Sequence, residues 1–170
     1  MIIDLNSLQG NCGDFNLELS PNEFDVETVG VSLSAPIRSD VSVTKGADRL
    51  KVVGKVAADL EIDCLRCLEP FKHEMRFEFT ADFVPPEHFT TDGEHQVSGD
   101  DLNVDVIQDD RLDLVGLLKE QVLLNLPESA CCRQDCKGLC EKCGENRNLI
   151  DCSCKEKEID PRWAALKNMK

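Results

Sequence analysis

Residues 131–154 read CCRQDCKGLCEKCGENRNLIDCSC and hold seven of the ten cysteines of the chain. From the second cysteine onward, the spacing is C-x3-C-x3-C-x2-C-G-x7-C-x-C. Within it, Cys140, Cys143 and Gly144 have the form of a zinc knuckle. Two cysteines two residues apart can turn both sulfurs toward one ion, and the glycine permits a positive φ at the turn. The predicted four-thiolate zinc site comprises Cys140, Cys143, Cys152 and Cys154.

A second C-x-x-C pair lies far upstream, at Cys64 and Cys67. It falls in the connection between two long predicted strands, and the tip of a rigid hairpin is well placed to hold a metal. Because eight thiols would fill two four-thiolate sites, Cys64 and Cys67 can share a second site with Cys132 and Cys136. Cys136 is also the predicted substitute ligand of the first site. Two ordinary reduced cysteines are the alternative for the upstream pair.

Other uses of the cysteines are less favoured. A disulfide framework needs an oxidising compartment, and residues 1–9 show neither the basic nor the apolar region of a secretory signal. We therefore expect a cytoplasmic protein that is not exported. A redox dithiol stays open, because a lone C-x-x-C is ambiguous. An iron–sulfur cluster is disfavoured, because the spacing matches neither common ferredoxin pattern.

The residues upstream of the cysteine-rich stretch have the periodicity of β-strands. Apolar side chains recur at every second position through much of residues 1–106, most clearly over 56–62 and 75–83. These last two segments predict a long antiparallel hairpin. Its predicted inward side chains are Val56, Ala58, Leu60, Ile62, Met75, Phe77, Phe79, Ala81 and Phe83.

One long helix is predicted over about residues 110–125. It would start at Arg111 behind an Asp109 or Asp110 cap and end before Pro127. The predicted fold class is α+β. An antiparallel β-rich body, barrel-like or a strongly bent sheet, spans residues 1–128 with the helix packed on it. A cysteine-rich, metal-stapled segment spans residues 129–170.

Charge and motifs limit the function classes. The net charge of −14 is uneven: residues 1–130 hold 10 basic and 26 acidic side chains, residues 131–154 hold four of each, and residues 155–170 hold five basic and three acidic ones. The body should therefore repel RNA phosphates, and the C-terminal part should contact RNA more readily. No run is apolar enough to cross a membrane, and no motif supports catalysis or a small-molecule substrate. We expect a non-enzymatic acidic protein.

A short final helix is predicted after the last cysteine. Asp160 is a suitable N-cap, and Pro161 suits the first helical position. A helix below about 12–15 residues is marginal alone, so it must dock on its own body or on a partner. Its predicted partner-binding residues are Arg162, Trp163 and Leu166.

Several motifs occur in an order that resembles a known family. They are Cys64-Leu-Arg-Cys67-Leu68, the helix running into Leu126-Pro127, Cys132-x3-Cys136-Lys-Gly-Leu-Cys140-x2-Cys143-Gly-x-Asn146, Cys152-x-Cys154 and Asp160-Pro161-Arg162-Trp163-Ala-Ala-Leu166. Together they span most of residues 50–170. This combination resembles the YceD-like large ribosomal RNA subunit accumulation proteins of bacteria and plastids.

The resemblance implies a non-enzymatic factor in ribosome biogenesis, needed for large-subunit ribosomal RNA to accumulate. In bacteria, genes of the family often neighbour that of a zinc-ribbon large-subunit ribosomal protein. The implied partner is therefore a large-subunit precursor, through its RNA or a ribosomal protein. Two alternatives remain: a thiol-redox or metal-responsive protein, and a zinc-ribbon adaptor for a non-ribosomal protein.

Overall fold

The computed structural model describes residues 1–24, 26, 28–88 and 104–154. Its strands are β1 (Ile2–Asp4), β2 (Cys12–Leu19), β3 (Val31–Leu33), β4 (Ile37–Lys45), β5 (Leu50–Asp63), β6 (Pro70–Val84), β7 (Val104–Val106) and β8 (Arg111–Asp113). The helical elements of this described part are α1 (Leu114–Leu124) and the short 3-10 helices η1 (Leu5–Ser7), η2 (Gln9–Asn11) and η3 (Pro86–His88).

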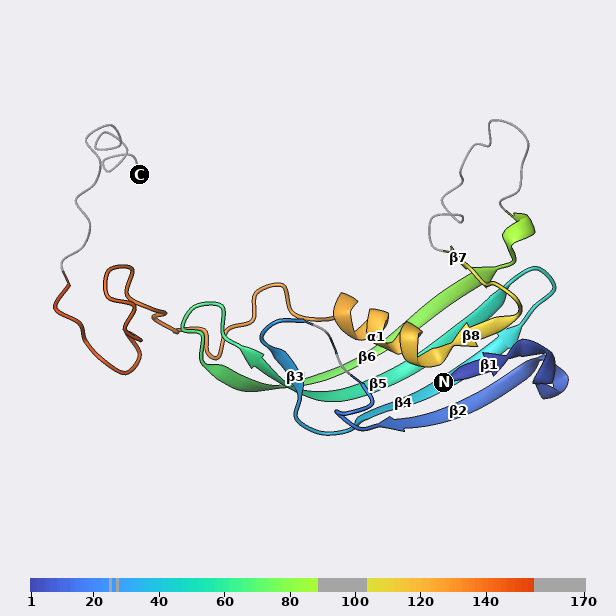
Figure 1. Cartoon of the computed structure of the whole chain (residues 1–170), viewed down its shortest axis with the longest axis horizontal. Helices are drawn as coiled ribbons and strands as arrows, with labels where there is room; N and C mark the ends of the chain where they lie inside the picture. Colours follow the sequence, from blue (N-terminus) through green and yellow to red (C-terminus); the bar gives the residue numbers. More distant parts are fainter. Residues whose placement is uncertain (25, 27, 89–103, 155–170) are drawn as a thin grey trace, which may run out of the picture.

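A six-stranded sheet forms the body. Its order is β2-β4-β5-β6-β7, and β3 pairs with β5 beyond the part of β5 that pairs with β4. The β6–β7 pair is parallel and the other pairs in this sheet are antiparallel. Figure 1 shows the long strands curving together, with α1 alongside them. β2 and β7 stand at opposite ends of this strand order and do not pair with each other. The sheet is therefore open and bent, which is one of the two predicted forms, and is not closed into a barrel.

β5 and β6 form the predicted hairpin. They pair in one continuous antiparallel register from Leu50 opposite Phe83 to Asp63 opposite Pro70. Along β5, buried and exposed residues alternate strictly, as expected for a strand that covers a core with one face. The buried side chains of the hairpin include Leu60 of β5 and Phe79 and Phe83 of β6. The alternation in the sequence therefore identified both the strands and their inward face.

The start of the helix differs from the prediction. Arg111–Asp113 is strand β8, which pairs antiparallel with β1, so α1 begins only at Leu114. The predicted caps, Asp109 and Asp110, both have left-handed backbone angles, with φ of 55° and 52°. Asp113 caps the helix instead, and its carboxylate accepts a hydrogen bond from the backbone N–H of Val115 at 3.2 Å.

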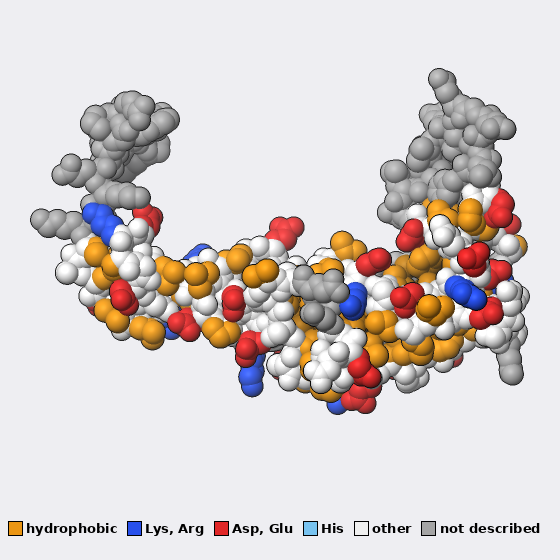
Figure 2. All heavy atoms as spheres, in the orientation of Figure 1, with side chains coloured by type: hydrophobic (Ala, Val, Ile, Leu, Met, Phe, Trp, Pro, Cys, Tyr) orange, Lys and Arg blue, Asp and Glu red, His pale blue; other side chains and the backbone are white. Residues whose placement is uncertain are grey.

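One face of α1 closes the core of the body. Leu114, Leu117, Leu118 and Val122 are buried and join the inward side chains of the strands in one apolar cluster. The α+β class with a β-rich body and one packed helix is therefore confirmed. Figure 2 shows acidic side chains spread over this body. The cysteine-rich segment, residues 129–154 and called the arm below, projects from the body in Figure 1. Among the described residues, no helix is both long and apolar enough to span a membrane.

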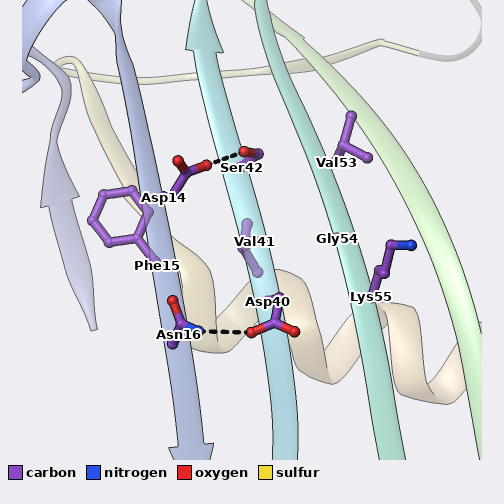
Figure 3. Close-up of a pocket in the computed structure, with 9 residues that line it drawn as sticks. All are labelled: Asp14, Phe15, Asn16, Asp40, Val41, Ser42, Val53, Gly54 and Lys55. Atoms are coloured by element: carbon purple, nitrogen blue, oxygen red, sulfur yellow. Dashed lines mark hydrogen bonds between the residues drawn. The ribbon is translucent and has the colours of Figure 1, made fainter.

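The other face of the sheet is polar. Figure 3 views it with α1 behind the strands and shows a shallow hollow over β2, β4 and β5. In this hollow, the hydroxyl of Ser42 donates a hydrogen bond to the carboxylate of Asp14, and the amide of Asn16 donates one to the carboxylate of Asp40 at 2.9 Å. These side chains bond to one another across neighbouring strands, as is usual on the solvent face of an antiparallel sheet.

Candidate functional site

Eight of the ten cysteines lie in two groups of four. The proximal cluster comprises Cys64, Cys67, Cys132 and Cys136, and the distal cluster comprises Cys140, Cys143, Cys152 and Cys154. Within each cluster, the four sulfurs lie within 4.8 Å of one another. All ten cysteines are within the described residues, and all are free thiols. Each cluster could therefore bind one metal ion. Metal binding by the two clusters stays a prediction.

The sulfur spacing of the proximal cluster fits a tetrahedral metal site. The sulfurs of Cys64 and Cys136 are 3.8 Å apart, and those of Cys67 and Cys132 are also 3.8 Å apart. A tetrahedron with metal–sulfur bonds of about 2.3 Å has an edge of about 3.8 Å. A disulfide would instead bring two sulfurs to about 2.05 Å. The spacing therefore matches four ligands around one ion better than a cross-linked pair.

The proximal cluster is built where the arm meets the hairpin tip. Backbone hydrogen bonds of 2.9 Å join Leu65 N–H to Ala130 O and Leu139 N–H to Arg66 O. The guanidinium of Arg66 also donates to the carbonyls of Cys136 at 3.1 Å and Gln134 at 3.3 Å. Figure 1 shows the chain returning to this tip after α1. Two segments that are distant in sequence thus each supply two cysteines.

A glycine permits this close approach. A Cβ at residue 138 would lie 2.9 Å from the backbone oxygen of Arg66, and Gly138 has a φ of +69°. Both the contact and the left-handed backbone disfavour any side chain there. With Gly138 in place, the arm lies close enough to the tip for Cys64, Cys67 and Cys136 to be buried, with exposed fractions of 0%, 4% and 5%.

The distal cluster is built on a small hairpin in the arm. An isolated antiparallel bridge pairs Leu139 with Asn146, and Cys140 N–H donates to Glu145 O at 2.8 Å. The turn is closed by a 2.9 Å hydrogen bond from Gly144 N–H to Cys140 O, and Gly144 has a φ of +74°. This is the turn that the knuckle spacing predicts. The distal cluster is the more open one, because Cys143 and Cys154 are exposed.

The thiols of the proximal cluster differ in pKa. Burial raises the pKa of Cys64, but backbone N–H groups, including those of Cys132 and Cys67, outweigh it and lower the pKa to about 6. Burial and the neighbouring cluster thiols raise the pKa of Cys132 to about 12. Cys64 is therefore ionised at neutral pH, and binding a metal would displace the proton of Cys132.

The distal cluster has the same division. Backbone N–H groups of Cys143 and Lys142 lower the pKa of Cys140 to about 6. The hydrogen bond with Cys143, followed by burial, raises the pKa of Cys154 to about 12. Cys64 in the proximal cluster and Cys140 in the distal cluster are thus thiolates that can bind a cation first, as a metal ligand requires.

Some residues of interest lie outside these clusters or outside the described residues. Cys12, at the start of β2, is exposed, and Cys131 packs against the proximal cluster without being one of its four members. The predicted partner-binding residues Arg162, Trp163 and Leu166 lie outside the described residues.

Sequence reasoning missed the groups that surround the ligands. Arg66 bonds to the arm carbonyls, and Asn148 donates a hydrogen bond to the sulfur of Cys136 at 3.3 Å. The place of Arg66 between two cysteines was a signal for its position. Nothing in the local pattern marked Asn148, because its contact is made across the arm.

The similarity to known proteins covers the part of the chain that contains both clusters. A family model described as large ribosomal RNA subunit accumulation protein YceD matches residues 52–170. An uncharacterized protein of Mycobacterium tuberculosis is 31% identical over 150 residues, which cover 88% of this chain and 70% of that protein. No solved structure matches.

Two plant proteins are also similar. The large ribosomal RNA subunit accumulation protein YCED homolog 1, chloroplastic, of Zea mays is 26% identical over 179 residues, covering 92% of this chain and 60% of that protein. A protein of the same description from Arabidopsis thaliana is 27% identical over 156 residues, covering 79% of this chain and 49% of that protein. Since the family model spans more than half of the chain, including both clusters, the chain belongs to the YceD family of large ribosomal RNA subunit accumulation proteins.

Proposed function

We propose that this protein is a non-enzymatic, cytoplasmic factor in large-subunit assembly, required for large-subunit ribosomal RNA to accumulate. We propose further that each cysteine cluster holds one zinc ion, so that the arm is a zinc-stapled surface for ribosomal RNA or a ribosomal protein. Membership of the family supports the first statement. The observation that supports the second is the division of eight cysteines into two sets of four, each with its sulfurs within 4.8 Å of one another and the proximal set with the 3.8 Å spacing of a tetrahedral site.

Zinc is the metal that this donor set suits best. Four thiolates select soft or borderline metals, and zinc accepts a closed tetrahedral site without redox chemistry. A four-thiolate zinc site carries a formal charge of about −2. Basic side chains in the arm can offset that charge; they are Arg133, Lys137, Lys142 and Arg147.

The distribution of charge favours the arm and the C-terminal end as the contact region for RNA. Residues 1–130 carry 26 acidic against 10 basic side chains, whereas residues 155–170 carry five basic and three acidic ones. An RNA backbone would be repelled by the first region and attracted weakly by the second. We propose Arg162, Trp163 and Leu166 as the partner-binding residues of this end.

Sedimentation of cell extracts tests the assembly role. We expect the full-length protein to travel with precursor large subunits, and the association to weaken as salt is raised if RNA phosphates are contacted. A protein that stays at the top of the gradient at every salt concentration would contradict this role. Retention on particles stripped of RNA would identify a ribosomal protein as the partner.

Replacing the tryptophan tests the proposed contact. Trp163→Ala should weaken association with large-subunit precursors by at least about tenfold, because aromatic anchors at interfaces are often worth about 2 kcal/mol or more. Its metal content should not change, since residue 163 lies beyond the last cysteine. Trp163→Phe, which retains an aromatic ring, should lose less. Equal association of all three proteins would remove this end of the chain from the proposal.

A thiol-redox function is the second candidate. The pKa values of about 6 at Cys64 and Cys140 favour it, because a thiolate is the reactive form. Metal analysis combined with thiol titration separates the two functions. Zinc-bound protein should show eight protected thiols, whereas a redox protein should show thiols that react and re-form disulfides reversibly.

A further inference from the structure

Asn148 lies between the two cysteine clusters. It belongs to the loop of residues 144–151, which joins Cys143 to Cys152, two members of the distal cluster. Its side chain nevertheless reaches the proximal cluster, where the amide nitrogen donates to the sulfur of Cys136 at 3.3 Å. A residue of the distal loop thus contacts a proximal ligand directly.

The side chain of Asn148 is fully hydrogen-bonded. Its amide nitrogen also donates to Oδ1 of Asn146 at 2.8 Å. Its Oδ1 accepts from the backbone N–H of Lys137 at 2.8 Å and from the guanidinium of Arg133 at 2.7 Å. An amide offers two donor hydrogens and two acceptor lone pairs, and all four are used here.

This pattern fixes which way the amide points. Turning it over would aim the NH2 group at the Lys137 and Arg133 donors, and would aim the oxygen at the sulfur and at Oδ1 of Asn146. All four contacts would then be lost. The N–H group therefore faces the sulfur of Cys136, where it stabilises negative charge, as hydrogen bonds to metal-ligand sulfurs do.

The loop that carries Asn148 is anchored at both of its ends by the distal cluster. Between these ends, Arg147 N–H donates to Gly138 O at 2.9 Å and Leu149 N–H donates to Asn146 O at 3.0 Å. A metal ion shared by Cys143 and Cys152 would reduce the freedom of the loop and so favour the position in which Asn148 meets Cys136.

We propose that Asn148 is a positioning residue that couples metal binding at the two clusters. A metal at the distal cluster orders the loop, the loop presents the Asn148 amide to Cys136, and the proximal cluster then binds its own metal more tightly. By linkage, the proximal metal strengthens distal binding by the same factor. This inference rests on the proposed metal sites.

Zinc titration of the metal-free, full-length protein against a chromophoric chelator tests the coupling. The distal cluster is disabled by Cys152→Ser with Cys154→Ser, and the affinity of the remaining site is measured. We expect that affinity to fall about tenfold or more relative to the proximal site of the wild type, the usual range for loss of a residue that supports a ligand. In an Asn148→Ala background, Cys152→Ser with Cys154→Ser should cause no further loss of affinity at the proximal site.

Asn148→Asp distinguishes coupling from simple loop structure. Aspartate can still accept from Lys137 and Arg133, but it has no hydrogen to donate to the sulfur. The proposal expects Asn148→Asp to weaken the proximal site about as much as Asn148→Ala. A purely structural role for the oxygen would leave Asn148→Asp like the wild type, and this result would overturn the proposal.

Control measurements distinguish loss of the coupling from loss of a metal site or of the fold. Asn16→Ala removes an exposed amide that bonds Asp40 on the outer face of the sheet, and should leave both affinities unchanged. Cobalt spectra of each variant report whether a four-thiolate site still forms, and circular dichroism reports whether the sheet is intact. If Cys152→Ser with Cys154→Ser weakens the proximal site equally with and without Asn148, the coupling does not pass through Asn148. A wild-type protein that binds no metal would instead refute the proposed sites themselves.

Discussion

Chelation of the metal-loaded protein is expected to unfold residues 131–154 and leave the β5–β6 hairpin folded. Structural zinc sites of this type contribute on the order of 10 kcal/mol of binding free energy, which the arm would lose. The backbone hydrogen bonds that join the arm to the hairpin tip, at Leu65 and Leu139, are few. The hairpin keeps its own uninterrupted pairing from Leu50 to Asp63.

Metal analysis should find two zinc ions per chain before chelation. Segment-resolved hydrogen exchange should afterwards find protection lost in the arm and at Leu65 of the hairpin tip, whose N–H donates to Ala130 O, and retained in β5 and β6. Cys67→Ser should reduce the zinc content to one ion. Cys12→Ser is the matched control, because Cys12 is exposed and lies outside both clusters. A purified protein with no bound metal and ten freely titrating thiols would contradict both sites.

Acid should release the metal. Binding requires deprotonated thiols, and the pKa values of Cys132 and Cys154 in the metal-free protein are raised to about 12. Protons therefore compete with the metal for these ligands, so that affinity falls as the pH is lowered. The same titration at two pH values measures the number of protons displaced.

Leu118→Ala is expected to destabilise the body by about 2–5 kcal/mol. Leu118 has an exposed fraction of 0% and joins the apolar cluster between α1 and the sheet, so truncation leaves a cavity in the core. The midpoint of thermal unfolding should fall by roughly 10 °C for a loss near the middle of this range.

Leu124→Ala is the matched control on the same helix. Its side chain is 76% exposed, and its truncation should change stability by about 0.5 kcal/mol or less. Thermal unfolding followed by circular dichroism gives the midpoint of each variant for comparison. Equal midpoints would show that the buried face of α1 does not stabilise the body.

Local pattern was sufficient for the elements whose environment repeats along the chain. β5 alternates because one of its faces covers the core and the other meets solvent, and that difference recurs at every second residue. The knuckle turn at Gly144 was also readable, because two cysteines and the glycine that permits the turn are neighbours in sequence.

Pattern failed at the start of α1. Residues 111–113 are compatible with the first turn of a helix, but they pair with residues 2–4 as strand β8. That pairing joins segments more than 100 residues apart, and a local window contains no sign of it. The competing strand partner therefore moved the cap from Asp109 or Asp110 to Asp113.

The sequence by itself determined the β-rich class, the long hairpin and the pool of eight cysteines, since each depends on residue type and short spacing. Only the tertiary structure decided that the arm lies against the hairpin tip, where Arg66 bonds to the carbonyls of the arm and Asn148 to Cys136. These contacts join segments that are distant in the sequence or lie on opposite sides of a turn. Their existence depends on how the segments pack, because a side chain's partner across such a gap is set by three-dimensional distance and leaves no periodic trace in the chain.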